Sequence, residues 1–600
     1  MKAVGMLVPV LVILGGVSGL GIAAGLGSAA VLAGLVALFC FIAAFGGPLR
    51  ADLRLLAVFA PAMILGVAGP RLLAGVSEAA AIALLCAVVF AAGLLPALGT
   101  RYVTVGLGLG MSAVFGYGFR MTGSANAAQI IAAPALAVGA VLVLRLLLGL
   151  RDPGKPTREA LADALAGEGS SASDAARLWL ADRPVTWTAR VFGATLRYRT
   201  ARGLLTARRR ALDETQRDAV DRILAGAAET AEQIAGAIRP RSAMDSPQEI
   251  ERIDADVELP GETAKVVDGL WSALEVATAA AHERDTSTVD VPAKLRRTVL
   301  RTELEGALSW RSAQLRHAVR CALGMAVALV VAAQRPGDPL TVSFLMATFA
   351  IMQPEWRDSL AKGRQRIGGT VAGAVVLALL AWLLPPSALM PAGLLAALAG
   401  FPFLKTRPVV FTASMVVLSV GLNAERGHLD PGGLLAEYAL LILLAVAIGL
   451  LFGFAAVPGV RKPPPAERFA TAVSAVSALF AEAAAAIRAG SPDPRALATR
   501  FRTAARTAQD LVTGEPGAVP LTPAQRDTVD ETDESLRGLT AAAVAMLLNP
   551  SPVLADAAES VAREEEPVFE TAKLGDEERL VLDTMRADVL RLRRAEAVLS

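Results

Sequence analysis

The residues with the most suggestive chemistry form a charged segment between two apolar runs, and it contains Glu355, Arg357, Arg364 and Arg366. A guanidinium group pairs with a carboxylate through two parallel hydrogen bonds, so arginines at a membrane surface can attract organic anions. The same residues can instead orient the flanking spans and pair with one another. The segment therefore predicts either an anion-attracting vestibule or a topology signal.

Three further ionisable residues stand within apolar runs, where a central charge costs on the order of several kcal/mol and marks a functional candidate. Arg320 lies about one turn into its run, and Arg145 lies near the end of another. Both can instead extend to the lipid headgroups. Glu437 is a candidate for proton coupling, because a protonatable carboxylate can take up a proton, although an interfacial position explains it equally well.

Small and hydroxyl-bearing residues indicate how helices pack around the charged segment. Gly369 and Gly373 are four residues apart on one helix face, which allows two helices to approach closely, and Thr370 can hydrogen-bond across that contact. We expect the two glycines to act as a close-packed hinge. Hydroxyl and aromatic residues of the preceding run either line a path for an amphipathic aromatic acid or pack against other helices: Thr341, Ser343, Phe344, Thr348 and Phe349.

Motifs for ATP hydrolysis, metal binding and other catalysis are missing from the sequence. Gly149, Gly154 and Lys155 have the spacing of a phosphate-binding loop, but Pro156 stands where a hydroxyl must bind magnesium. The three cysteines lack pair spacing and the three histidines are far apart, so neither a disulfide framework nor a metal site is expected. We expect no enzyme activity and no cofactor.

The distribution of charge predicts the elements that position these residues. The 600-residue chain is 54% hydrophobic and 19% charged, which is too apolar for a wholly soluble protein. Residues 1–150 and 317–457 contain only 24 of the 114 charged residues and are therefore expected to be two membrane blocks. A net charge of +2 excludes a strongly basic nucleic-acid-binding protein.

Apolar runs of about 20 residues without two-residue alternation predict membrane-spanning helices, so the fold class is all-α. Six spans are expected in each block: 4–24, 28–46, 54–70, 77–97, 102–119 and 127–149, then 317–333, 340–354, 367–385, 388–403, 408–423 and 433–457. Residues 151–316 and 458–600 are rich in Ala, Leu, Arg and Glu, which predicts helical cytoplasmic domains. The expected polytopic architecture is thus two repeats of about six transmembrane helices, each followed by such a domain.

Basic residues in the predicted loops give the orientation. With the N-terminus inside, 14 Lys and Arg residues fall on the cytoplasmic side and 4 on the outer side. We therefore expect a multi-pass protein of the cell (inner or plasma) membrane with both termini in the cytoplasm.

The sequence around the charged segment resembles the fusaric acid resistance protein-like (FUSC) family of the aromatic acid exporter group. The resemblance is carried by Gln353-Pro354 at a span end and by Arg366, Gly369, Thr370 and Gly373, in the pattern Arg-x-x-Gly-Thr-x-x-Gly. The duplicated order of spans and cytoplasmic regions resembles that family over essentially the whole chain. Residues 47–54, the corresponding stretch of the first half, keep basic residues but lack Gly-Thr, so that half is expected to be mainly structural.

This resemblance implies an exporter of organic anions, with aromatic carboxylates or related toxic compounds as substrates and the proton gradient or membrane potential as the driving force. The expected substrate path contains Arg320, Arg357, Arg364, Arg366 and Thr370. Two alternatives stay open, namely a non-transporting scaffold with partner-binding cytoplasmic helices and a passive anion channel. The expected partners are the lipid bilayer and small organic anions, and the sequence leaves open a homo-oligomer and an accessory protein.

Overall fold

The computed structural model describes most of the chain: residues 2–99, 101–119, 125–167, 172–209, 212–242, 250–289, 308, 310, 312–353, 356–385, 388–403, 406–427, 429–455, 464–490, 493–512, 522–548, 550–567 and 576–599. Within these residues the regular elements are helices, apart from one isolated antiparallel bridge between Val185 and Thr288. The predicted all-α class is confirmed for this part of the chain.

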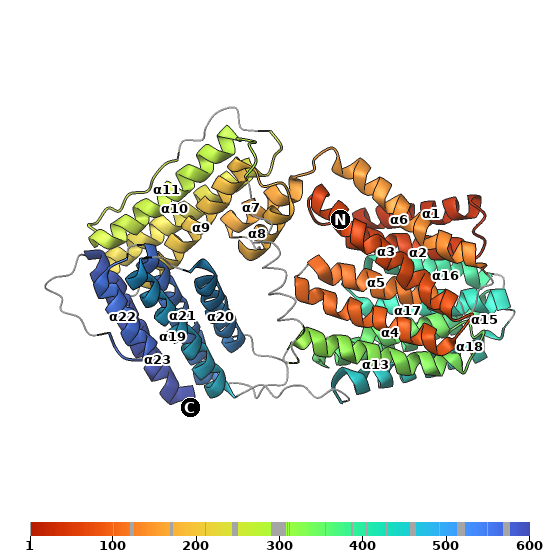
Figure 1. Ribbon diagram of the computed structural model, residues 1–600. Coiled ribbons are helices and arrows are strands. Elements are labelled where there is room, and N and C mark those ends of the chain that lie inside the picture. Colours follow the sequence, from red (N-terminus) through yellow and green to blue (C-terminus); the bar gives the residue numbers. More distant parts are fainter. Residues whose placement is uncertain are drawn as a thin grey trace. The chain divides into compact units, whose positions relative to one another are not determined.

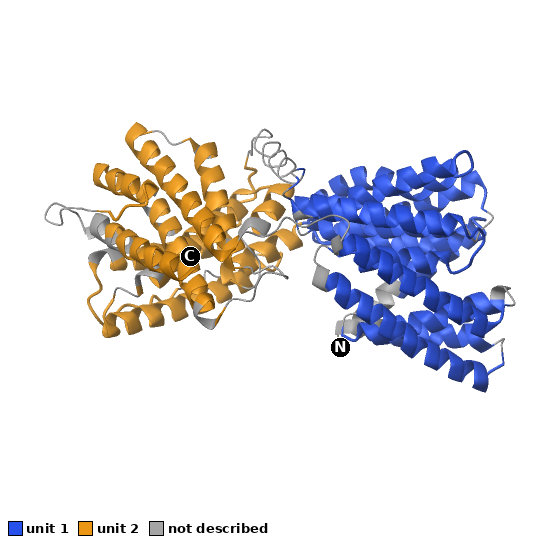
Figure 2. Cartoon of the chain, turned by 90° about the horizontal axis from the view of Figure 1, so that it is seen from below, with its two compact units in different colours: residues 1–153, 292–460 blue, residues 154–291, 461–600 orange. Residues whose placement is uncertain are grey.

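The chain divides into two compact units, and each unit is built from two separate segments (Figure 2). Unit 1 contains residues 1–153 and 292–460, and unit 2 contains residues 154–291 and 461–600. The helices at the predicted spans all belong to unit 1. The division into four domains, 1–150, 151–316, 317–457 and 458–600, stays a prediction.

Unit 1 has a helix at each predicted span (Figure 1). Those of the first block are α1 (Lys2–Ala23), α2 (Ala29–Ala44), α3 (Leu49–Leu73), α4 (Glu78–Leu94) with the 3-10 turn η1 (Leu95–Leu98), α5 (Arg101–Gly118) and α6 (Ala127–Gly149). Those of the second block are α13 (Ala313–Ala333), α14 (Thr341–Ile351), α15 (Trp356–Leu383), α16 (Leu389–Gly400) with η5 (Phe401–Phe403), α17 (Pro408–Gly427) and α18 (Pro431–Leu450) with the π-helical turn η6 (Leu451–Ala455).

Eight of the described helices are long and apolar enough to cross a membrane. Seven of them are in unit 1, namely α3, α4 with η1, α6, α13, α15, α17 and α18 with η6. Large apolar side chains such as Val58 and Trp382, 74% and 82% exposed, cover the outside of these helices, as expected for a lipid-facing surface. The arrangement as two repeats of six spans stays a prediction.

Two predicted spans correspond to helices that are shorter than predicted. α14 and α16 have 11 and 12 residues. At 1.5 Å per residue they extend only about 16–18 Å, roughly half of the hydrocarbon thickness of a bilayer. Much of α14 is buried among other helices, whereas α16 exposes Leu394, Leu395 and Leu398, so an apolar run does not by itself give the length of a helix.

In the first block, contacts between the ends of different helices show that these ends lie at two opposite faces of the helix layer. At one face, Asp52 near the start of α3 pairs with Arg101 at the start of α5 and Arg145 near the end of α6. At the other face, the Tyr117 hydroxyl at the end of α5 donates to Glu78 at the start of α4. We call these the Asp52 face and the Glu78 face. Helix ends alternate between them, as they do when successive helices cross a layer in opposite directions.

One hydrophobic core of unit 1 joins helices of both blocks, and a second core lies within the first block. Leu85 of α4 and Tyr117 of α5 are buried in the same cluster as Met325 of α13 and Phe344 of α14. Small residues allow this contact, since a Cβ added at Gly93 would stand only 2.9 Å from the Ala318 Cα. α4 and α5 therefore belong structurally with the second block as much as with the first.

Unit 2 consists of two groups of helices (Figure 1). The first comprises α7 (Lys155–Ala166), α8 (Ala172–Ala181), α9 (Thr186–Arg208), α10 (Glu214–Ile238) and α11 (Gly261–Glu283). The second comprises α19 (Pro465–Ala489), α20 (Pro494–Val512), α21 (Pro523–Leu548), α22 (Pro552–Ala562) and α23 (Asp576–Leu599). Each group has its own hydrophobic core. α19 is the eighth helix of span length, yet its apolar face packs in the second core through Phe469, Leu479 and Phe480.

Candidate functional site

Arg364 and Arg366 lie inside helix α15, whereas the sequence predicts a loop before a span that starts at residue 367. The helix begins eleven residues earlier, at Trp356. Its first turns contain charged residues such as Lys362, which form helix readily but lower the hydropathy. The predicted position of these arginines in a loop is therefore wrong, because hydropathy detects only the apolar part of a helix.

The two arginines have different surroundings. Residues two apart in a helix point about 200° away from each other. Arg364 is exposed, whereas Arg366 is partly buried and lies near the phenol of Tyr438 in α18. Arg357 belongs to the first turn of α15, but its side chain lies outside the described part of the chain, as does Glu355. The described arginines thus do not form a single cluster.

The glycines that follow Arg366 face α17. A Cβ added at Gly373 would stand 2.7 Å from both the carbonyl oxygen of Ala413 and the Cβ of Val416. Gly369 makes an equally close contact with Thr412. The adjacent Thr370 is buried, but its Oγ1 has no hydrogen-bond partner among the described residues. The structure therefore shows a close α15–α17 contact, while the hinge role and the hydrogen bond across the contact stay predictions.

Arg320 belongs to a different helix pair. It lies in the second turn of α13 and is only 9% exposed, so its surroundings are protein rather than lipid headgroups. Its helix packs on α4 at Ala318, and His317 contacts the Cys321 thiol at 3.5 Å. Arg320 and Arg366 therefore lie on different helices, and a common path through both stays a prediction.

Glu437, the candidate for proton coupling, forms an ion pair. Its carboxylate pairs with Arg335 of the α13–α14 connection, and Arg335 also lies 3.2 Å from Asp338. The Glu437 side chain is 32% exposed, which fits an interfacial cluster. This setting favours the structural explanation, and the coupling role stays a prediction.

The polar and aromatic residues of α14 mostly contact neighbouring helices. The hydroxyls of Ser343 and Ser419 are 3.0 Å apart, which joins α14 to α17. The hydroxyl of Thr348 donates to the carbonyl of Phe344 in its own helix. Phe349 packs on α5, where a Cβ at Gly110 would stand 2.5 Å from its ring. These contacts favour the packing interpretation of this helix over a path lining.

A buried charged cluster in the first block was not predicted. Asp52, 0% exposed, accepts a 2.7 Å hydrogen bond from Arg145 Nε at Oδ2 and a second bond from Arg101 Nη2 at Oδ1. Arg145 Nη2 also donates to the carbonyl of Gly47 at 2.9 Å, and the guanidinium lies 5.2 Å from the Phe45 ring centroid. Arg145 is therefore enclosed by protein and does not extend to the headgroups as the sequence suggested.

The backbone of residue 47 lies against this cluster. A Cβ added at Gly47 would stand 2.5 Å from Arg101 Nη1 and 2.7 Å from Asp52 Oδ1. Glycine is thus required for the chain to approach the two charged groups. One feature of the sequence could have indicated this cluster. Asp52 and Glu78 are the only two acidic residues in residues 1–150, so each of them is expected to have a partner.

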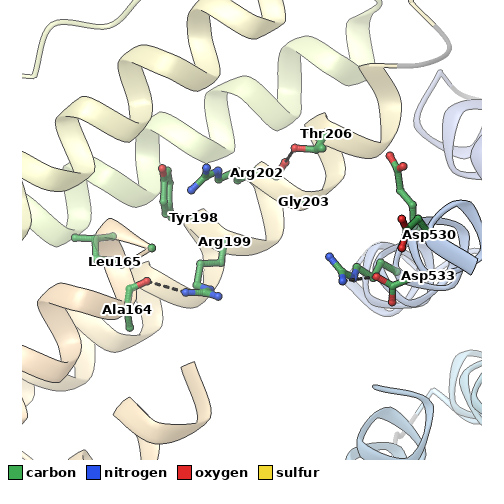
Figure 3. A pocket seen from close by; sticks show the side chains of 13 residues that line it. Ala164, Leu165, Tyr198, Arg199, Arg202, Gly203, Thr206, Asp530 and Asp533 are labelled. Atoms are coloured by element: carbon green, nitrogen blue, oxygen red, sulfur yellow. Dashed lines mark hydrogen bonds and ion pairs between the residues drawn. The ribbon is translucent and has the colours of Figure 1, made fainter. Parts of the chain in front are cut away.

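Unit 2 contains a cleft of about 590 Å³ between α9 and α21. Figure 3 shows Arg199 and Arg202 on one side and Asp530 and Asp533 on the other. Arg199 donates to the carbonyl of Ala164, and Asp533 pairs with Arg537 one turn along α21. The cleft is open and charged on both walls, which suits a polar ligand or a peptide more than a hydrophobic compound.

Comparison with known proteins identifies the second block. Residues 327–456 match the family model described as fusaric acid resistance protein-like. The predicted family resemblance is confirmed for this segment. It extends from α13 through α18 and includes Arg366, Gly369, Thr370 and Gly373. The curated proteins and the solved structures compared with this chain include no match.

The fusaric acid resistance protein-like segment and the apolar helices together indicate a multi-pass membrane protein of the transporter type. The matched family is one of membrane transporters. Among the described residues no group of three or more His, Cys, Asp or Glu side chains is placed to hold a metal ion.

Proposed function

We propose that this chain exports organic anions, with aromatic carboxylates as the substrate class, from the cytoplasm across the cell membrane. The observation that carries the proposal is the family match over residues 327–456, which contain the Arg-x-x-Gly-Thr-x-x-Gly pattern. The excess of basic residues in the predicted inner loops supports cytoplasmic termini and a cytoplasmic unit 2. In this orientation the Asp52 face is the inner face.

Arg366 is the proposed anion-binding residue of this segment. It is partly buried in α15 beside Tyr438, and a guanidinium in a reduced dielectric attracts a carboxylate more strongly than one in water. Arg364 is exposed and would act at longer range, by raising the local anion concentration in a salt-dependent way. Arg320, buried in α13, and Thr370 would continue the path.

The membrane potential is a sufficient driving force for this export. Moving one negative charge outward across an inside-negative membrane is favourable by about 2.3 kcal/mol per 100 mV. Proton coupling would add to this term, but it is not required for net efflux.

The test uses the full chain in liposomes loaded with radiolabelled benzoate, with a potassium diffusion potential imposed. We expect saturable benzoate efflux that depends on the potential. Arg366→Gln should lower this efflux about tenfold, because it removes a charge-assisted hydrogen bond of about 1.5–3 kcal/mol. Arg364→Gln is the matched control, since it removes the same charge at an exposed position of the same helix and should change efflux by about twofold or less.

Other outcomes identify the alternatives. An anion conductance that follows the gradient without saturation would indicate a channel. No transport from a broad panel of aromatic acids would contradict the exporter and favour a scaffold, for which the α9–α21 cleft of unit 2 is the candidate binding surface.

A further inference from the structure

The Asp52–Arg101–Arg145 cluster contains two positive charges and one negative charge. Each carboxylate oxygen of Asp52 is already engaged by one arginine. A buried cluster with an uncompensated charge is costly, and such charges are normally paired. The excess positive charge at this face therefore needs an explanation.

The segment after α6 supplies one further described acid at this end, Asp152, where the Leu49 amide donates to the Pro153 carbonyl. α3 contributes Asp52 itself and the exposed Arg50 and Arg54, α5 contributes Arg101, and α6 contributes Arg145 and is followed by the exposed Arg151. α2 carries no Asp, Glu, Lys or Arg, and the only acid of α4, Glu78, lies at the opposite face. The excess charge is thus a property of the whole Asp52 end of the first block.

The excess charge belongs to Arg101 rather than to Arg145. Arg145 makes two hydrogen bonds, to Asp52 and to the Gly47 carbonyl, and its guanidinium lies over the Phe45 ring. Arg101 has one bond to Asp52, and its Nε is buried without a hydrogen-bond partner among the described residues. Its side chain is also 23% exposed, compared with 8% for Arg145. Arg101 is therefore the less enclosed of the two arginines, and atoms of its side chain other than Nε are open to the outside.

We propose that Arg101 is an anion-binding residue that receives a small organic carboxylate at the Asp52 face, positioned by Asp52 and Arg145. The carboxylate binds at the exposed part of the Arg101 side chain and neutralises the excess charge. This inference rests on the proposed function only in taking the anion to be an organic carboxylate. It assigns a ligand site to the half of the membrane unit that lacks the Gly-Thr pattern.

The geometry predicts opposite effects for two neighbouring substitutions. Arg101→Gln leaves a neutral Asp52–Arg145 pair, so the cluster stays satisfied while the anion site is lost. Asp52→Asn removes the internal competitor and raises the excess charge, so it should bind an external anion more tightly. A purely structural triad predicts that both substitutions only destabilise the protein.

The experiment measures equilibrium binding of benzoate to the purified full chain in nanodiscs by isothermal titration calorimetry, with benzamide as the uncharged probe. We expect the wild type to bind benzoate and not benzamide. Arg101→Gln should weaken benzoate binding about tenfold or more, the effect of losing a hydrogen bond to a charged group. Arg50→Gln removes the same charge from an exposed position one residue into α3 and should change the affinity by about twofold or less.

The binding measurements can overturn the proposal that Arg101 binds an anion. Absence of benzoate binding to the wild type, or equal affinity in the Arg101→Gln and wild-type proteins, would overturn it. Thermal unfolding of every variant is measured in parallel, and if Asp52→Asn fails to fold, the comparison of Arg101→Gln with Arg50→Gln still decides. Binding without efflux would refute the exporter and leave this site standing, whereas efflux with unaltered binding in Arg101→Gln would refute this site alone.

Discussion

Gly369 of α15 lies so close to Thr412 of α17 that a Cβ at position 369 would stand 2.6 Å from the Thr412 Cγ2 and 3.1 Å from the Val409 carbonyl oxygen. The neighbouring Gly368 is exposed, and a Cβ there would meet only the Val409 Cγ1 at 3.9 Å. The two adjacent glycines therefore have opposite tolerance for a side chain.

Gly369→Ala should destabilise unit 1 by about 1–3 kcal/mol, because the added methyl group forces α15 and α17 apart. Gly368→Ala is the matched control and should be neutral or stabilising by up to about 1 kcal/mol, since alanine favours helix. Thermal unfolding in detergent measures both. Equal midpoints for the two variants would show that the contact tolerates a side chain.

Glu437→Gln should cost less than about 1 kcal/mol of stability, because its ion pair with Arg335 is partly exposed. We also expect the pH dependence of anion efflux to be unchanged, since the pairing indicates an interfacial role. The assay compares efflux from liposomes at several imposed pH gradients. Loss of the proton dependence with normal protein abundance would instead establish Glu437 as a coupling residue.

Cysteine labelling tests the proposed orientation. Val76, 89% exposed in the α3–α4 connection, lies at the Glu78 face, and Glu232 is exposed on α10 of unit 2. In intact cells, Val76→Cys should react with an impermeant maleimide, whereas Glu232→Cys should react only after permeabilisation. The native cysteines provide the background, and Cys40 and Cys321 are buried. The reverse labelling pattern would invert the topology.

Asp213 caps helix α10 and should make its first turn sensitive to acid. Its Oδ1 accepts bonds from the Gln216 amide at 2.8 Å and the Thr215 hydroxyl at 2.7 Å, and these bonds lower the pKa of the carboxyl. The stabilisation is therefore complete above the unfolded-state pKa and is lost as the pH falls through the lower folded-state pKa.

Hydrogen exchange at the start of α10 measures this effect in the full chain. Asp213→Ala should exchange faster than the wild type at pH 7, and the difference should shrink towards pH 3. The exposed Asp218 on the same helix provides the control, and its replacement by alanine should leave the exchange rate at both pH values nearly unchanged. A difference that persists at acidic pH would contradict the capping mechanism.

The positions of the helices could be predicted from the sequence, because an apolar run bounded by charged residues marks a segment that is removed from water. The first residue of α15 could not be predicted in this way, since residues such as Asp358 and Lys362 belong to the helix but are not apolar. The length of α14 was also overestimated, because an apolar run of Thr341–Ile351 is equally consistent with lipid and with protein surroundings.

The candidate site was predictable only where its residues are neighbours in sequence. Gly369 and Gly373 share a face by their spacing, so the close contact followed from the sequence, although α17 as the partner did not. Asp52 is 49 residues from Arg101 and 93 from Arg145, and no local pattern connects them. Only the scarcity of acids in the first block indicated that Asp52 needed a partner.

The separate cores of unit 2 have a consequence for the order of synthesis. The first core draws on residues 160–281 and the second on residues 469–599, and the second apolar block is made between them. The first helix group can thus bury its core while the ribosome is still translating the second block. The contacts between the two groups, such as those of α9 with α21 and of α11 with α23, must wait for the final segment. A stalled chain that ends near residue 460 would therefore carry a folded first group whose α9 surface has not yet met α21.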